Sequence, residues 1–321
     1  MKRLLCGMLV FVALPLANVC RADVFGNGAN SFEIEFVTIG DPGNPADMTG
    51  DPNPAGSVPY TYRIGKYEVS ESMINRANAQ STADGNPLGI TIDSRGPHKP
   101  ATSVSWFEAA RFVNSLNTST GHVPAYKFDA NGEFQLWEPS DAGFDPQNLF
   151  RNRLAFYLLP TADEWYKAAF FDPTSDTWFD FPNGSNMAPV PVASGTAPGT
   201  AVFDQPFEQG PADIMFAGGP SPFGTVAQAG NVWEWEETEV DLLNDDPLAV
   251  RGFRGSDWNL TSGDPIGLSS SFRHFIQLPG RSVADIGFRV ASIIPEPTSF
   301  WLVACGVWTV LLITRQFGRM R

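Results

Sequence analysis

The chain has 321 residues, of which 43% are hydrophobic and 12% aromatic, and a formal net charge of −14 at pH 7. This composition is typical of a globular protein with a sizeable core. The charge argues against a nucleic-acid partner, because phosphate contacts need clustered lysines and arginines, and no basic run lies outside the two termini.

The first segment, residues 1–22, has the features of a secretory signal peptide. Lys2 and Arg3 precede an apolar stretch, residues 4–17, and the small residue Ala22 marks a cleavage point. The apolar stretch is too short for a retained membrane helix. We therefore expect the domain that follows to be exported.

Residues 23–294 are expected to form one domain, since no repeat or low-complexity linker divides them. The first predicted elements are two strands, residues 32–40 and 60–69, in which apolar and aromatic residues are frequent. Ser70 is then the predicted cap of a helix that begins at residue 71 and ends at about residue 79.

Two further helices begin at capping boxes. Ser105 is followed three residues later by Glu108, and Thr161 in the same way by Glu164. In this pattern a hydroxyl and a carboxylate each accept a hydrogen bond from a free backbone N–H group at the start of the helix. Helices are therefore expected directly after Ser105 and Thr161.

Two more strands are predicted after these helices, over residues 231–235 and 286–293. The rest of the domain consists of stretches rich in Gly, Pro, Asp and Asn, which are typical of loops. Few regular elements joined by long loops indicate an α+β fold.

The last segment, residues 295–321, contains a Pro-Glu-Pro triplet, an apolar run at 300–313 and an arginine-rich end. This combination resembles the PEP-CTERM sorting signal of bacterial envelope proteins. The resemblance implies a tail that tethers the exported protein at the inner membrane until exosortase-type machinery sorts it to the surface. An ordinary C-terminal anchor is the alternative, with the same orientation, because the trailing arginines stay cytoplasmic.

Several motifs of the domain occur in the order seen in one protein family. They are YRIGKYEVS (62–70), PATSVSWFEAARF (100–112), LLPTADEWYKAAF (158–170), GNVWEW (230–235), RGFRGSDW (251–258) and GFRVAS (287–292). The set resembles the formylglycine-generating, or sulfatase-modifying factor, family. The resemblance implies an elaborated C-type-lectin-like fold, which is α+β and rich in loops.

Enzymes of this family oxidise a sulfatase cysteine with copper and dioxygen, and two cysteines before the final Gly-Phe-Arg hold the metal. Here the corresponding segment, residues 251–289, contains no cysteine, and Cys6, Cys20 and Cys305 all lie in the terminal segments. Asn259 and its neighbours offer only hard or neutral ligands, whereas copper(I) prefers thiolates. We therefore expect copper to be absent and the domain to be a non-catalytic ligand-binding or structural protein.

An oxidoreductase that uses a different metal site is the alternative. Its candidate ligands are His98, His122 and His274, which are widely separated in the sequence and lack the spacing of a helical metal pair. Isolated histidines are more often surface or hydrogen-bonded residues. A third possibility is a domain that assists exported sulfatases without oxidising them.

The resemblance also implies a calcium site around GNVWEW. On this sequence its ligands are the carbonyls of Gly230 and Val232 and the carboxylate of Glu234. A fourth position, Asn or Asp in the family, is Ala227 here and supplies no side-chain oxygen. Calcium prefers six to eight oxygen ligands, so water or another carbonyl would have to replace the missing one.

The same motif also has a purely structural interpretation. Trp233 and Trp235 share one face of the predicted strand and can simply pack in the core. Glu234, Glu236 and Glu237 would then form a solvated acidic patch.

The segment that carries the active site in the enzymes is the expected ligand surface. There Trp258 offers a ring for stacking, while Ser256, Asn259 and Arg273 offer hydrogen bonds, which suits a glycan, a peptide or another envelope protein. The alternative is that these side chains are structural, with Arg273 in an ion pair.

Overall fold

The computed structural model describes residues 21–261 and 265–294. The predicted C-terminal sorting signal lies outside these ranges, as does the predicted signal peptide except for Arg21 and Ala22, which belong to the first strand. Within the described ranges, every helix is too short or too polar to cross a membrane.

A five-stranded antiparallel sheet forms one side of the molecule. Its order is β1 (Arg21–Phe25), β2 (Phe32–Ile39), β3 (Tyr62–Gly65), β15 (Ala291–Ile293) and β6 (Tyr157–Leu158). The strand predicted over residues 32–40 is confirmed as β2, in which buried apolar residues alternate with more exposed ones up to Phe36. The strand predicted over residues 60–69 is shorter, because only the four residues of β3 pair with β2 and β15.

A second, four-stranded sheet lies on the other side. Its order is β13 (His274–Gln277), β12 (Arg251–Arg254), β11 (Trp233–Glu239) and β14 (Ile286–Gly287). The predicted strand 286–293 is divided between the two sheets, because Ile286 pairs with Trp233 of β11 whereas Ala291 pairs with Ile64 of β3. The residues between β14 and β15 therefore carry the chain from one sheet to the other.

The three predicted helices are confirmed as α1 (Glu71–Ala83), α2 (Trp106–Ser119) and α3 (Ala162–Phe170). Both predicted capping boxes form, since the Ser105 and Thr161 backbone N–H groups each donate to the following glutamate at 2.8 Å. Ser70 caps α1, and its hydroxyl accepts from the Met73 backbone at 3.3 Å. Local side-chain-to-backbone bonds thus set where each helix begins.

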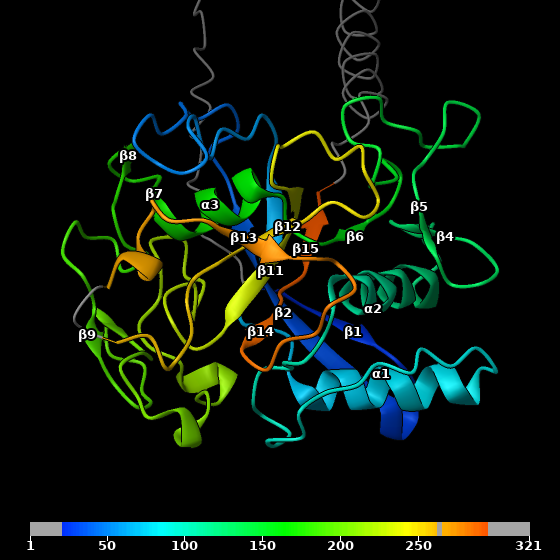
Figure 1. Ribbon diagram of the computed structural model, residues 1–321, viewed down its shortest axis with the longest axis horizontal. Helices are drawn as coiled ribbons and strands as arrows, with labels where there is room; N and C mark the ends of the chain where they lie inside the picture. The colour runs from blue at the N-terminus through cyan, green and yellow to red at the C-terminus, as the bar shows by residue number, and fades with distance from the viewer. Residues whose placement is uncertain (1–20, 262–264, 295–321) are drawn as a thin grey trace, which may run out of the picture.

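The remaining elements are short. They are β4 (Lys127–Phe128), β5 (Phe134–Gln135), β7 (Phe171–Asp172), β8 (Thr177–Trp178), β9 (Val190–Pro191), β10 (Thr200–Ala201) and the 3-10 helices η1 (Gly28–Asn30), η2 (Phe207–Gln209), η3 (Ile214–Phe216) and η4 (Pro265–Leu268). Long loops connect them, as Figure 1 shows.

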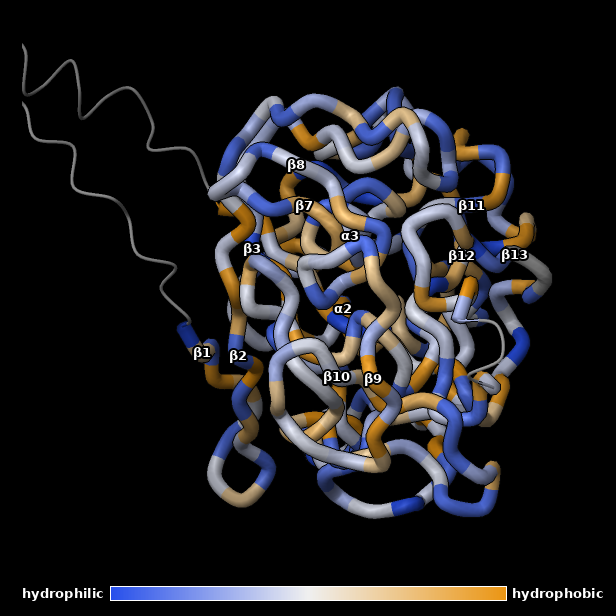
Figure 2. Tube along the Cα trace, turned by 90° about the vertical axis from the view of Figure 1, so that its left-hand side faces the viewer, coloured by the Kyte–Doolittle hydropathy of each residue, from blue (hydrophilic) through white to orange (hydrophobic). Residues whose placement is uncertain are grey.

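The main core lies between the two sheets. Figure 2 shows β1, β2 and β3 along one side of the molecule and β11, β12 and β13 along the other, with α2 and α3 between them. Phe36 of β2, Trp106 of α2 and Trp235 of β11 are all fully buried in one hydrophobic cluster. The indole N–H of Trp106 donates to the Glu236 carbonyl, and that of Trp235 to the Val104 carbonyl, both at 2.9 Å. The start of α2 is therefore joined to the middle of β11.

The glutamates of β11 are not the solvated patch that the alternating sequence suggested. Glu234, Glu236 and Glu237 are 0% exposed, because loops and helices cover both faces of the strand. Each carboxylate accepts hydrogen bonds from at least one arginine, and the arginines are Arg289 for Glu234, Arg254 and Arg273 for Glu236, and Arg151 for Glu237. We call this set the glutamate–arginine ladder. Burying these charges is tolerable only because each is paired.

Removing one member of the ladder should destabilise the fold strongly. Glu236 accepts from Arg254 Nε and Arg273 Nε, both at 2.7 Å. In Glu236→Gln both guanidiniums lose their counter-charge in the core, and we expect a loss of about 3–5 kcal/mol in the free energy of unfolding. Urea unfolding followed by tryptophan fluorescence measures this loss.

Glu35→Gln is the matched control. Glu35 pairs with Lys66 at 3.3 Å, but both side chains are partly exposed, so the same substitution should cost less than about 1 kcal/mol. Equal losses in the two variants would show that the ladder does not stabilise the core.

Candidate functional site

Three of the four predicted ligand residues are buried. Trp258 and Ser256 are 0% exposed and Arg273 is 4% exposed, whereas Asn259 is exposed. The Trp258 ring contacts the Phe207 ring, with centroids 5.7 Å apart, and the Arg95 guanidinium lies 4.8 Å from its centre. Trp258 therefore packs against the protein itself, and the prediction of an open stacking face at this residue was wrong.

Arg273 is also structural, as the alternative interpretation proposed. Besides its bond to Glu236, it donates to the Thr238 and Glu239 carbonyls, each at 3.0 Å. Asn259 donates to the Gln205 carbonyl at 3.2 Å at the surface. The four predicted residues thus share a segment and its neighbouring strand, but they do not form one open surface.

One of the predicted calcium ligands, the Glu234 carboxylate, is paired with other side chains in this arrangement. One Glu234 oxygen accepts from Arg289, and the other accepts from Arg289 Nε at 2.5 Å and from Trp165 Nε1 at 2.7 Å. A calcium ion near the Gly230 and Val232 carbonyls would have to displace this guanidinium from the carboxylate. Calcium binding therefore stays a prediction.

The three histidines do not gather into a metal site in the described part of the chain. His122 stacks on Phe156 with ring centroids 4.7 Å apart, and His274 stacks on Phe253 at the same distance. His98 lies in an exposed loop.

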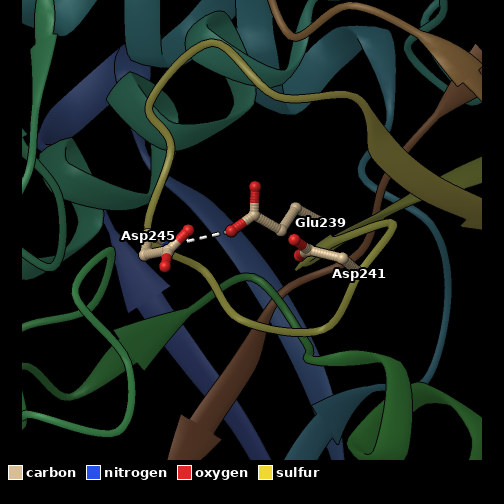
Figure 3. Close-up of side chains that lie close together, drawn as sticks. All are labelled: Glu239, Asp241 and Asp245. Atoms are coloured by element: carbon tan, nitrogen blue, oxygen red, sulfur yellow. Dashed lines mark hydrogen bonds between the residues drawn. The ribbon is translucent and has the colours of Figure 1, made fainter.

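One acidic cluster comes close to the spacing of a metal site. Oxygens of Glu239, Asp241 and Asp245 lie within 4.8 Å of one another (Figure 3). The bond drawn in the figure runs from the Asp245 backbone N–H to the Glu239 carboxylate at 2.5 Å. Glu239 is buried, and burial together with repulsion by Asp241 raises its pKa. The loop after β11 accounts for this geometry, since Glu239 accepts the backbone N–H that closes it.

Two of the buried polar atoms without partners among the described residues belong to Ser256 and Asp285, and the Asp257 carboxyl is close enough to Asp285 to be repelled by its charge. Asp257 is 9% exposed, and burial and repulsion by Asp285 raise its pKa to about 6. Burial also raises the pKa of Asp285, whose Oδ1 has no hydrogen-bond partner among the described residues. The same is true of Ser256 Oγ, which is fully buried. Buried polar atoms without partners are rare, and Ser256 Oγ and Asp285 Oδ1 are two of them.

Aromatic rings border these groups. Trp233 is half-buried at the start of β11, and its backbone N–H donates to the Asp285 carbonyl at 2.9 Å. Its ring meets those of Phe272 and His274, with centroids 6.0 and 5.6 Å apart. Burial lowers the pKa of His274, which favours the neutral imidazole. We call Trp233, Ser256, Asp257, His274 and Asp285 the Asp257–Asp285 site.

Arginine 95 holds the loop that carries Asp285. Arg95 Nη1 donates to the Ala284 carbonyl at 2.8 Å, and Arg95 Nη2 pairs with Asp93 at 2.9 Å. The loop is thus fixed to the segment that carries Asp93 and Arg95, which lies far away in the sequence. This rigidity keeps Asp285 close to Asp257 although their charges repel.

Below about pH 6 the Asp257 carboxyl keeps its proton and can donate a hydrogen bond, whereas its ionised form only accepts. Together with partly exposed rings, this set suits the binding of hydroxyl groups. Sequence reasoning found Ser256 but missed Asp257 and Asp285, because isolated loop aspartates normally indicate solvent-exposed turns. The adjacency of Asp257 to Ser256 was the only local signal.

Asp257→Asn should stabilise the protein near neutral pH. The folded-state pKa of Asp257 is raised from 3.8 to about 6, so its stabilising protonated form is present below pH 4 and is lost as the pH rises through 6. Asparagine imitates the neutral form, and we expect a gain on the order of 1–3 kcal/mol at pH 7.5 that vanishes near pH 4. Thermal unfolding of both proteins between pH 4 and 8 tests this expectation. A gain that does not depend on pH would contradict it.

Comparisons with known proteins agree with the fold. The protein-family model of the sulfatase-modifying factor enzyme 1-like domain matches residues 46–294 of this chain. Treponema denticola variable protein 1 superposes with a TM-score of 0.55 and 18% identity, covering 85% of this chain and 99% of that one. CarF superposes with a TM-score of 0.55 and 20% identity, and the match covers 81% of this chain and 98% of CarF. No curated protein sequence matches the chain.

At these identities the two structures show a shared fold alone. The predicted α+β, loop-rich fold is confirmed by the described elements and by the family match. The chain belongs to the sulfatase-modifying factor enzyme 1-like domain family.

Proposed function

We propose that this protein is an exported, envelope-associated, ligand-binding member of the family without copper-dependent oxidase activity. The observation that carries the proposal is the chemistry of the segment from residue 251 to 289. It contains no cysteine, and it includes the buried carboxyl of Asp257 and two buried polar atoms, Ser256 Oγ and Asp285 Oδ1, that have no hydrogen-bond partner among the described residues. Carboxyls and a hydroxyl bind ligands through hydrogen bonds and do not replace thiolates at copper.

The ligand that the Asp257–Asp285 site favours is a glycan. Sugar hydroxyls both donate and accept, which matches the Asp257 and Asp285 carboxylates as acceptors and the Ser256 hydroxyl, which has no partner among the described residues, as a donor. Trp233 is half-buried, its backbone N–H donates to the Asp285 carbonyl, and its ring meets that of His274. An aromatic ring next to a few convergent polar groups is the usual composition of a small-molecule site.

The location in the cell envelope rests on the terminal segments. Residues 1–22 have the pattern of a signal peptide, and residues 295–321 that of a sorting tail or anchor. Exosortase-type machinery is the partner that such a tail implies. In this proposal the domain displays its glycan site outside the inner membrane.

Glycan and peptide arrays probed with the full-length purified protein test the ligand class. We expect glycans among the hits. Asp257→Asn and Asp285→Asn should each lower the affinity for the best glycan by about tenfold in calorimetry, which corresponds to the loss of one hydrogen bond to a charged group. Asp176→Asn is the control, because Asp176 is exposed and its positive φ of 53° suits asparagine as well.

Arrays with peptide hits only, or a glycan that binds both site variants as tightly as the unaltered protein, would contradict the proposal. Because Asp257→Asn is expected to be more stable at pH 7.5, a loss of binding in this variant does not report unfolding.

The absence of oxidase activity has its own test. With copper, dioxygen and a sulfatase-type cysteine peptide, we expect no aldehyde product by mass spectrometry. After exposure to calcium, copper and iron and thorough washing, we expect no retained copper in metal analysis. Formation of the aldehyde would refute the non-catalytic assignment.

A further inference from the structure

A cavity of about 540 Å³ lies between α1, α2, the turn after β1 and Phe128. Figure 1 shows α1 and α2 next to each other with β1 beside them. The cavity shares no lining residue with the Asp257–Asp285 site. Its volume is that of a pocket for a small organic molecule.

The floor of the cavity is apolar. Phe25, Phe32 and Leu116 are buried beneath it, and Leu88 and Phe128 line it while remaining partly exposed. A ligand with an aromatic or aliphatic body would cover these surfaces and gain the free energy of their removal from water.

Most of the hydroxyl and amide groups around the floor are already used by the protein. Their hydrogen bonds run from Ser115 Oγ to the Phe112 carbonyl, from Ser119 Oγ to the Leu116 carbonyl, from Asn114 Nδ2 to the Tyr126 carbonyl and from Gln80 Nε2 to Asp84. A hydroxyl has one proton to donate, so these serines have none left for a ligand. The wall is therefore poorly suited to a sugar.

Arg111 is the exception. It lines the cavity and is half-buried, and its guanidinium carbon lies 5.7 Å from the centre of the Phe128 ring. No hydrogen bond or ion pair joins its guanidinium to the described residues. A guanidinium presents five donors in a plane that matches a carboxylate.

Two aspartates at the rim restrict the charge of the ligand. Both Asp84 oxygens accept from Gln80 Nε2, and Asp129 Oδ1 accepts the backbone N–H groups of Asn131 and Glu133 at 2.8 and 2.9 Å. Both carboxylates lie beside the cavity. They would repel a polyanion more than a ligand with one negative charge.

We propose that this cavity binds a small apolar monocarboxylate, with the carboxylate on Arg111 and an aromatic or aliphatic body on the phenylalanine and leucine floor. The site is independent of the glycan site and of the function proposed for it.

Titration calorimetry on the full-length protein tests the assignment with phenylacetate, 3-phenylpropionate and octanoate as probes. We expect binding of at least one of them, and about tenfold weaker binding of its amide, which lacks the charge. Arg111→Met should lower the affinity for the carboxylate by about tenfold or more, and Arg111→Lys should lower it by less. Ser119→Trp, which adds a large side chain at an exposed position of the cavity wall, should abolish binding.

Arg153→Gln is the control, because Arg153 is an exposed arginine outside the cavity, and it should bind as the unaltered protein does. Thermal unfolding of each variant shows whether it is folded. The proposal is overturned if none of the probes binds at millimolar concentration, if acid and amide bind equally, or if folded Arg111→Met keeps its affinity.

Discussion

The buried pairing of β11 glutamates with arginines is the constraint on which the rest of the structure depends. Each guanidinium also bonds backbone carbonyls of other segments, so one strand fixes several loops. Arg289, for example, joins Glu234 to the carbonyls of Gly65 and Val226 at 2.9 and 3.0 Å. A fold with long loops needs such connections, because its loops have few ladder hydrogen bonds of their own.

The ladder also determines where ligand chemistry is located. Glu234 and Arg273 are paired internally, although the family resemblance points to their segments. Ser256 Oγ, just after β12, and Asp285 Oδ1, just before β14, are among the buried polar atoms left without partners in the described residues. Function in this domain is therefore expected where the internal pairing ends.

The parts of the fold that depend on neighbouring residues could be predicted from the sequence. The capping boxes located α2 and α3, and the alternation of apolar residues located β2, because both signals act over a few residues. The environment of the ladder could not be predicted in this way. The arginines that pair with Glu236, Glu237 and Glu234 include residues 18, 86 and 55 positions away, and an alternating acidic strand alone indicates solvent. The burial of Trp258 depends on equally distant contacts.

The passage of the chain from β14 to β15 has a consequence for how the domain unfolds. Within a few residues the same segment pairs with β11 of one sheet and with β3 and β6 of the other. Neither sheet can lose its strand without pulling on the other, so neither can open as a separate unit. The two halves of the molecule therefore form one cooperative foldon, and local opening is confined to the peripheral loops.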